Sequence, residues 1–159
     1  MLSVVVPTYN EAGSVSGLAD RLQVALAGRD WELVIVDDGS PDGTADVAAA
    51  LAPRIPVRVV RRGGKAGLAS AVLAGFSEAR GDILVVMDAD LSHPPETVPA
   101  LIAAIDGGAD LAVGSRYVSG GGVLDWPFPR RAVSRVACLL GRLLVPVRDA
   151  TSGFFALRR

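Results

Sequence analysis

The chain has 159 residues, half of them apolar and only 5% aromatic, which is enough sequence for about one domain with a core of Val, Leu, Ile and Ala. Its 16 Lys and Arg residues nearly balance 17 Asp and Glu residues, and no basic and aromatic stripe occurs, so we expect no nucleic-acid partner. The single cysteine, Cys138, excludes an internal disulfide. No apolar run is long enough to cross a bilayer, and the first residues favour a strand over a signal peptide.

Short apolar runs rich in β-branched residues alternate with segments of helical periodicity. In chain order, the pattern predicts a strand at 2–6, a helix from Val15 to Ala25, strands at 33–36 and 57–60 with a helix at 42–51 between them, a helix at 67–80, a strand at 82–87, a helix at 95–106 and a strand at 110–114. Continuous apolar runs are typical of strands that are buried on both faces of a mainly parallel sheet. The sequence therefore predicts one α/β domain over residues 1–159, with helices on both sides of the sheet.

Polar loops follow three of the predicted strands. PTYNE comes after the first strand, DDGSPDGT after the second and DADLSHPP after the fourth. In open parallel sheets, ligands bind beyond the carboxyl ends of the strands. We therefore expect these acid-bearing loops to form one binding site at that edge.

The segment MDADLSHPP carries two acids, Asp88 and Asp90, directly after the apolar run DILVV. Alternation along an extended chain would point both carboxylates to the same side. Two anions this close repel each other unless a cation or a shared proton lies between them. Carboxylate oxygens suit Mg²⁺ or Mn²⁺, which keep several waters and bridge to substrate phosphates. The motif alone leaves a solvated turn open as an alternative, because Asp is common in turns and Pro94 and Pro95 end the strand.

Other nucleotide and catalytic motifs are weak or absent in the sequence. No GxGxxG follows the first strand and no GxxxxGK[ST] occurs, which argues against a dinucleotide site and a P-loop. Lys65, surrounded by glycines, could touch phosphates, although a simple turn is the better explanation of the glycines. His93, the only histidine, precedes two prolines, and this context favours a role in turn geometry over catalysis.

The motifs PTYNE, VDDGSPDGT, GLASAVLAGF, MDADLSHPP, GSRY and the later TSGF together resemble family 2 glycosyltransferases of the GT-A fold, in the branch of dolichol- or polyprenol-phosphate mannose synthases. The resemblance covers nearly the whole chain, and DDGSPDGT with MDADLSHPP carries its specificity. It implies a GT-A nucleotide-sugar-binding sandwich that transfers mannose from GDP-mannose to a polyprenyl (dolichyl-type) phosphate, with inversion and with Mg²⁺ or Mn²⁺. Relatives usually continue past the final arginines, so we expect the chain to lack C-terminal elements of the family.

The resemblance also assigns roles to single residues. The positions that match nucleotide-sugar-binding residues are Pro7, Tyr9, Glu11, Val36, Asp38, Ala89, Asp90 and Arg116. The positions that match metal ligands are Asp88, Asp90 and Ser92, with Ser92 standing where some members have Gln. The catalytic set is Asp90, Arg116, Arg130 and Ser134, of which the last three match groups that hold the donor and acceptor phosphates. Phe155 stands where many relatives have Arg, so it receives no role.

A basic amphipathic pattern follows in residues 131–144. Its apolar positions are Val133, Val136, Ala137, Leu140 and Leu144, and its basic positions are Arg131, Arg135 and Arg142. Such a helix can be a solvated surface, or it can lie on an anionic membrane. With the implied lipid phosphate acceptor, the second interpretation predicts a peripheral protein at the cytoplasmic face of a membrane.

A lipid phosphate acceptor also shapes the expected mechanism. A phosphate monoester has a second pKa near ~6 and reaches the site as an anion, so it needs positioning by arginines rather than a general base. Three alternatives stay open: another donor such as UDP-glucose, a phosphohydrolase with Asp88 as nucleophile, and a non-catalytic nucleotide-binding fragment. A phosphohydrolase would place the motif on its first strand and a lysine after it, whereas the only lysine, Lys65, precedes the motif.

Overall fold

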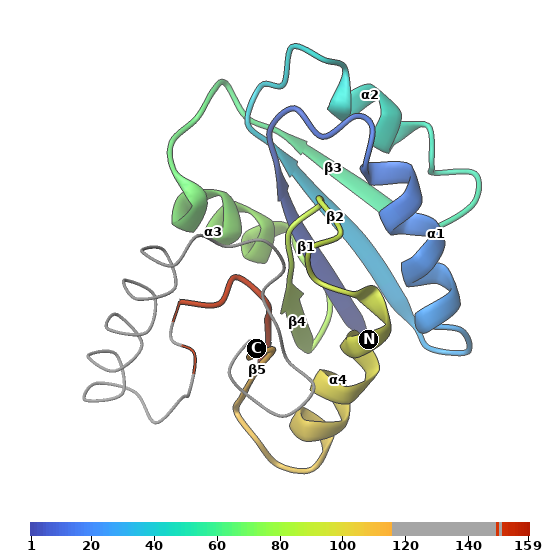
Figure 1. The fold of residues 1–159 in the computed structure, drawn as a ribbon, viewed down its shortest axis with the longest axis vertical. Helices are drawn as coiled ribbons and strands as arrows, with labels where there is room; N and C mark the ends of the chain where they lie inside the picture. The colour runs from blue at the N-terminus through green and yellow to red at the C-terminus, as the bar shows by residue number, and fades with distance from the viewer. Residues whose placement is uncertain (116–148, 150) are drawn as a thin grey trace, which may run out of the picture.

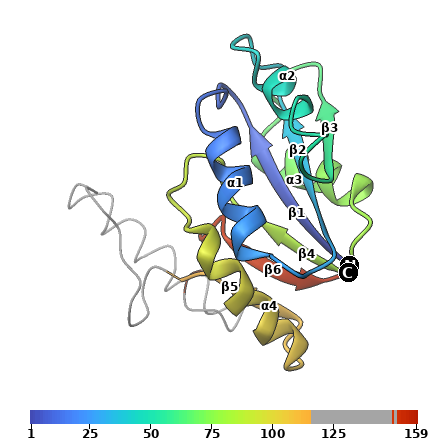
Figure 2. The ribbon, with the colours of Figure 1, turned by 90° about the vertical axis from the view of Figure 1, so that its right-hand side faces the viewer.

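The computed structural model describes residues 1–115, 149 and 151–159, which form a six-stranded sheet with helices on both faces (Figures 1 and 2). The strands are β1 (Leu2–Thr8), β2 (Trp31–Asp37), β3 (Val57–Arg61), β4 (Ile83–Val86), β5 (Leu111–Val113) and β6 (Phe155–Arg158). The helices are α1 (Val15–Ala25), α2 (Thr44–Ala49), α3 (Leu68–Glu78) and α4 (Val98–Asp106), with the 3₁₀ turn η1 (Pro95–Thr97) leading into α4. The strands and helices predicted from the sequence up to residue 114 are confirmed, with ends within about two residues.

The strand order β3-β2-β1-β4-β6-β5 places β1 near the middle of the sheet. Strands β1, β2, β3 and β4 are parallel neighbours, whereas β6 runs antiparallel between β4 and β5. The predicted mainly parallel sheet is confirmed, but β6 was not predicted. Its residues, FALR, follow the TSGF motif, and strand pairing with distant residues gives them their extended conformation.

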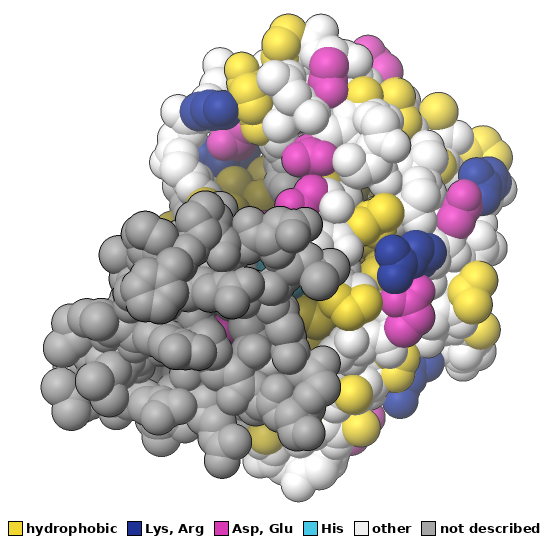
Figure 3. Space-filling view, viewed as in Figure 1, with side chains coloured by type: hydrophobic (Ala, Val, Ile, Leu, Met, Phe, Trp, Pro, Cys, Tyr) yellow, Lys and Arg dark blue, Asp and Glu magenta, His cyan; other side chains and the backbone are white. Residues whose placement is uncertain are grey.

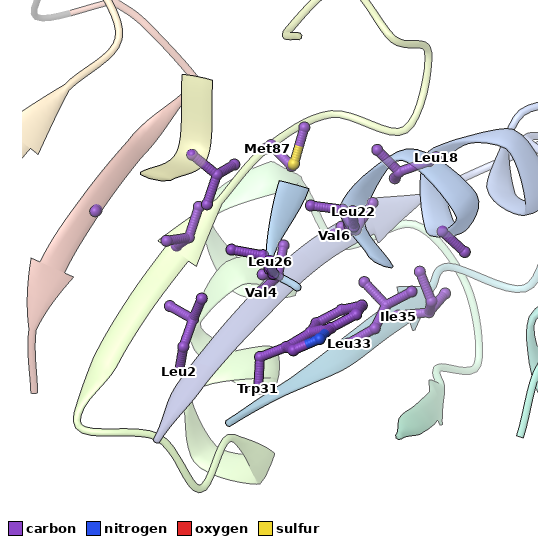
Figure 4. Packing of buried hydrophobic residues seen from close by; sticks show 14 of the residues in the cluster. Leu2, Val4, Val6, Leu18, Leu22, Leu26, Trp31, Leu33, Ile35 and Met87 are labelled. Carbon is purple, nitrogen blue, oxygen red and sulfur yellow. The ribbon is translucent and has the colours of Figure 1, made fainter. Parts of the chain in front are cut away.

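Side chains of alternating positions in the central strands enter two separate cores. On one face, α1 and α4 pack against the strands, and Figure 4 shows Leu18 and Leu22 of α1 above Val4, Val6 and Leu33. On the other face, α3 covers a smaller cluster made by the intervening positions of β1, β2 and β4. The strands are thus buried on both faces, which explains why they read as continuous apolar runs.

Gly81, in the turn between α3 and β4, lies directly against the start of β1. A Cβ atom at this position would lie 2.6 Å from the Ser3 nitrogen and 2.9 Å from the Met1 oxygen. These are backbone atoms of a paired strand and cannot move aside without disturbing the sheet. We expect Gly81→Ala to lower the free energy of unfolding by about 1–3 kcal/mol, measured by urea denaturation. The matched control is Gly17→Ala in α1, where a Cβ meets nothing within 4 Å, so better helix propensity should raise stability. Equal losses in both variants would contradict the steric argument.

Candidate active site

Three polar loops meet at one edge of the sheet because β1 lies between β2 and β4. The loops follow the carboxyl ends of these strands and comprise residues 9–14, 38–43 and 87–94. Figure 3 shows acidic side chains (magenta) close together on this side of the molecule, where Figure 1 has the upper ends of the strands. The edge predicted from the sequence is therefore where the acid-bearing loops converge.

Asp37, at the end of β2, joins the first two loops. Its carboxylate accepts hydrogen bonds from the Thr8 hydroxyl (3.2 Å) and from the backbone amide (3.0 Å) and hydroxyl (2.5 Å) of Ser40. The Ser40 hydroxyl oxygen in turn accepts from the Asn10 amide at 3.0 Å. Asp37 was not among the predicted site residues, although the sequence Asp-Asp-Gly-Ser-Pro that it begins is typical of a turn. Its role is to fix the shape of the site.

A second set of hydrogen bonds holds the loop that carries Glu11. The Asp42 carboxylate accepts from the Thr44 hydroxyl (2.5 Å) and from the Ala12 amide (3.0 Å), and these bonds hold the pKa of Asp42 below its usual range. The Thr44 hydroxyl oxygen accepts from the Glu11 amide at 2.9 Å, and Ser14 donates to Glu11 Oε2 at 2.8 Å. Glu11, a predicted nucleotide-sugar residue, is thus fixed through both its backbone and its carboxylate.

The remaining residues predicted to hold the nucleotide differ in exposure. Tyr9 is 38% exposed, and the Lys65 ammonium lies 3.4 Å above the centre of its ring. Pro7 is half-buried, and Val36 is completely buried, so that any contact of Val36 with a ligand would come from its backbone. Asp38 is only 8% exposed and lies 3.0 Å from the Arg62 guanidinium.

Asp88 and Asp90 lie in a turn beyond the end of β4. The sequence predicts that strand alternation points both acids to the same side. This is wrong, because the strand ends at Val86 and the two acids lie beyond it. Leu91, with φ of 61°, reverses the chain, and the Ser92 amide donates to Asp90 Oδ1 at 2.9 Å. Ala89 between the acids has its side chain buried, which leaves only its backbone for a ligand.

Asp88 lies in a field of like charges. Burial raises the pKa of Asp88, repulsion from Asp90 and Glu11 raises it further, and His93 opposes this rise. A cation would relieve this repulsion, and hard divalent cations take carboxylate oxygens. In residues 1–115, 149 and 151–159, no three His, Cys, Asp or Glu side chains are grouped to hold a metal ion. A pair of carboxylates still fits Mg²⁺ or Mn²⁺, because waters and substrate phosphates supply the other ligands.

His93 supports the acid-bearing turn. Its Nδ1 accepts a hydrogen bond from the Asp88 amide at 3.4 Å, and its ring stacks on Phe154 with centroids 5.1 Å apart. The segment before β6 also lies beside Asp88, because a Cβ atom added at Gly153 would lie 3.6 Å from Asp88 Oδ2. These contacts agree with the predicted role of His93 in turn geometry.

Asp88 is expected to reduce the stability of the metal-free protein. Because its pKa is raised by folding, the folded state binds more protons than the unfolded state between the usual and the raised pKa, and the free energy of unfolding falls as pH rises through this window. Asp88→Asn should therefore raise the free energy of unfolding at neutral pH, by less than about 1 kcal/mol because solvent screens the half-exposed side chain. Urea denaturation at neutral pH and below the usual carboxyl pKa checks this, and the difference should vanish at the lower pH. A destabilised variant at neutral pH would contradict the prediction.

Several predicted residues lie outside the part of the chain that the structure describes. They are Arg116, Arg130, Ser134 and the basic amphipathic segment 131–144. Among the helices that the structure describes, no helix is both long and apolar enough to cross a membrane.

Curated relatives resemble this chain over almost its whole length. It is 51% identical to the dolichol-phosphate mannosyltransferase of Pyrococcus furiosus, covering 99% of this chain and 46% of the relative. It is 46% identical to the polyprenol monophosphomannose synthase of Mycolicibacterium smegmatis (98% and 61%) and 43% identical to the dolichol-phosphate mannosyltransferase of Saccharomyces cerevisiae (99% and 60%). The chain thus spans about half to three fifths of the length of these curated relatives.

Solved structures share the fold. A mannosyltransferase from Pyrobaculum calidifontis in complex with GDP-Man and Mn²⁺ matches with a TM-score of 0.66 and 24% identity, over 99% of this chain and 44% of that one. A glucosyl-3-phosphoglycerate synthase from Mycobacterium tuberculosis with Mn²⁺, UDP-glucose and phosphoglyceric acid matches with a TM-score of 0.74 and 28% identity, over 99% and 56%. The expected GT-A fold is confirmed. The family profile described as Glycosyl transferase family 2 matches residues 3–159, and the chain belongs to this family.

Proposed function

We propose that the protein transfers mannose from GDP-mannose to a polyprenyl (dolichyl-type) phosphate with inversion at the sugar carbon. The observation that carries this proposal is the convergence of Glu11, Asp38 and the pair Asp88 and Asp90 on one edge of a family 2 domain. The names of the curated relatives support mannose as the sugar and a polyprenol-type lipid as the acceptor.

The nucleotide-sugar site would combine residues of the first two loops and the acid-bearing turn with Pro7 of β1, Val36 of β2 and Arg116. Asp38 and Glu11 accept hydrogen bonds from the nucleoside, because ionised carboxylates are acceptors only and ribose and base offer N–H and O–H donors. Tyr9, exposed beside them, offers an aromatic face. Pro7, Val36 and Ala89 contribute shape and backbone atoms, and Arg116 contributes charge toward the phosphates.

Asp88 and Asp90 would hold a divalent cation, Mg²⁺ or Mn²⁺, with Ser92 as a further oxygen ligand. This cation would neutralise charge on the diphosphate of the donor as the bond to the sugar breaks. The repulsion among Asp88, Asp90 and Glu11 supports the assignment, since a bound cation compensates it. Two structural neighbours were solved with Mn²⁺, which agrees with the same choice of metal.

The acceptor phosphate would be held by Arg116, Arg130 and Ser134. An ionised phosphate is itself the nucleophile, so these residues position it and compensate its charge, and no side chain has to remove a proton. The basic pattern of residues 131–144 would face anionic lipid, and this supports a peripheral location at the cytoplasmic face of a membrane.

Incubation with labelled GDP-mannose, Mg²⁺ or Mn²⁺ and polyprenyl phosphate tests the proposal, and a lipid-linked mannose is the expected product. A glucosyl lipid formed from UDP-glucose would instead identify another donor. Tight binding of GDP-mannose without any transfer, under conditions in which a full-length relative is active, would indicate a nucleotide-binding protein.

A further inference from the structure

Asp38 and Arg62 form a buried ion pair at the nucleoside end of the site. Asp38 follows β2 and Arg62 follows β3, and Arg62 Nη1 lies 3.0 Å from Asp38 Oδ1. The two side chains are only 11% and 15% exposed. A carboxylate removed from water to this extent needs a compensating charge, and the guanidinium supplies it.

The pair leaves hydrogen-bonding capacity unused. In the part of the chain that the structure describes, neither Asp38 Oδ1 nor Arg62 Nη1 has a hydrogen-bond partner, because the two atoms are close but not in hydrogen-bond geometry. Oδ1 itself is buried against Arg62, so the 11% of the Asp38 side chain that stays exposed lies on its other atoms. Hydrogen-bond donors of a bound ligand would approach the carboxylate on that exposed side, while Arg62 holds the buried side. The N–H and O–H groups of a nucleoside are such donors.

Arg62 is itself held in place from two sides. Its backbone amide donates to the Asp37 oxygen at 2.8 Å, which continues the pairing of β2 with β3. Its Nη2 donates to the Ser70 hydroxyl at 2.7 Å, and that hydroxyl also lies 2.8 Å from the Ala66 oxygen at the start of α3. The backbone of Arg62 is thus fixed by the sheet and its guanidinium by α3. The guanidinium therefore keeps its position, and its charge favours one orientation of the Asp38 carboxylate.

We propose that Arg62 is a positioning residue of the nucleoside site, which holds the Asp38 carboxylate in the orientation that accepts hydrogen bonds from the bound nucleoside. This rests on the proposed function only in that a nucleotide binds at Asp38. Arg62 acts through Asp38 and serves the nucleoside rather than the sugar. Loss of Arg62 should therefore weaken GDP and GDP-mannose binding by the same factor.

Calorimetric titration of the protein with GDP, GDP-mannose and UDP in the presence of Mg²⁺ tests this. Arg62→Gln should raise the Kd for GDP about 10- to 100-fold, in line with the coupling between two charged residues in contact. Arg62→Lys keeps the charge and should recover part of the affinity. The matched control is Arg61→Gln, because Arg61 is the neighbouring arginine, 56% exposed and paired with the exposed Asp46. This control should bind GDP like the wild type.

A double-mutant cycle separates positioning from a general loss of structure. Asp38→Asn alone should weaken binding, and the double variant with Arg62→Gln should bind no more weakly than Asp38→Asn, because the two residues act as one unit. Fully additive losses, or an Arg62→Gln variant indistinguishable from Arg61→Gln, would overturn the inference while leaving the proposed function intact. If the wild type binds UDP instead of GDP, the proposed donor fails and the same cycle with UDP decides on Arg62. If it binds no nucleotide, both proposals fail.

Discussion

Asp90→Asn is expected to weaken metal-supported binding of GDP-mannose and to lower turnover by on the order of a hundredfold to a thousandfold, the range seen when a preorganised electrostatic group is lost. The substitution keeps the shape of the side chain and can retain the hydrogen bond that Asp90 accepts from the Ser92 amide. It removes the negative charge that would hold the cation. Asp88→Asn should have the next largest effect, since Asp88 is more buried and shares the same charge cluster.

Calorimetric titration of each variant with Mn²⁺ and with GDP-mannose, with and without the metal, measures this effect. The matched control is Glu96→Gln, which removes an acid close by in the sequence that is exposed and forms an ion pair of 2.6 Å with Arg21. The control should bind Mn²⁺ and GDP-mannose normally. Unchanged GDP-mannose affinity of Asp90→Asn in the presence of metal would refute the metal assignment.

The sheet and the location of the site could be predicted from the sequence because both depend on local patterns. Strands buried on two faces are mostly apolar, and β1 and β2 show this in the continuous runs VVV and LVIV. Loops at the carboxyl ends of parallel strands share one edge whatever their detailed conformation, so the sequence alone predicts that DDGSPDGT and MDADLSHPP lie together.

Features that depend on contacts between distant residues could not be predicted. β6 is extended because it fits between β4 and β5, and nothing in its own four residues requires this. The turn that presents Asp88 and Asp90 depends on the left-handed conformation of Leu91, which is rare for a leucine. Arg62 contacts Asp38 where the neighbouring strands β2 and β3 end. The sequence does not indicate whether Arg61 or Arg62 points inward.

Arg116 and Arg130 are expected to be the most sensitive positions on the acceptor side, with a loss on the order of 2–4 kcal/mol in transition-state stabilisation when either is replaced by Gln. Arg116 follows the segment of β5, whose carboxyl end shares the edge of the sheet with β4. Arg130 precedes Ser134 by four residues, a spacing that brings side chains to one face of a helix. Both residues would compensate phosphate charge, so their loss should lower turnover at every pH.

His93→Ala should behave differently, because an acceptor that arrives ionised needs no general base. Its contacts with the Asp88 amide and with Phe154 are structural. Loss of a general base lowers turnover by at least roughly a hundredfold, and we expect His93→Ala to lower it by less than that. The deciding measurement is the rate with polyprenyl phosphate from about pH 5.5 to about pH 8, which spans the second pKa of a phosphate monoester. The wild type and His93→Ala should show the same dependence on pH, set by ionisation of the acceptor. An inactive His93→Ala variant beside a fully active Arg130→Gln variant would reverse the mechanism, because it would indicate base catalysis on a hydroxyl acceptor.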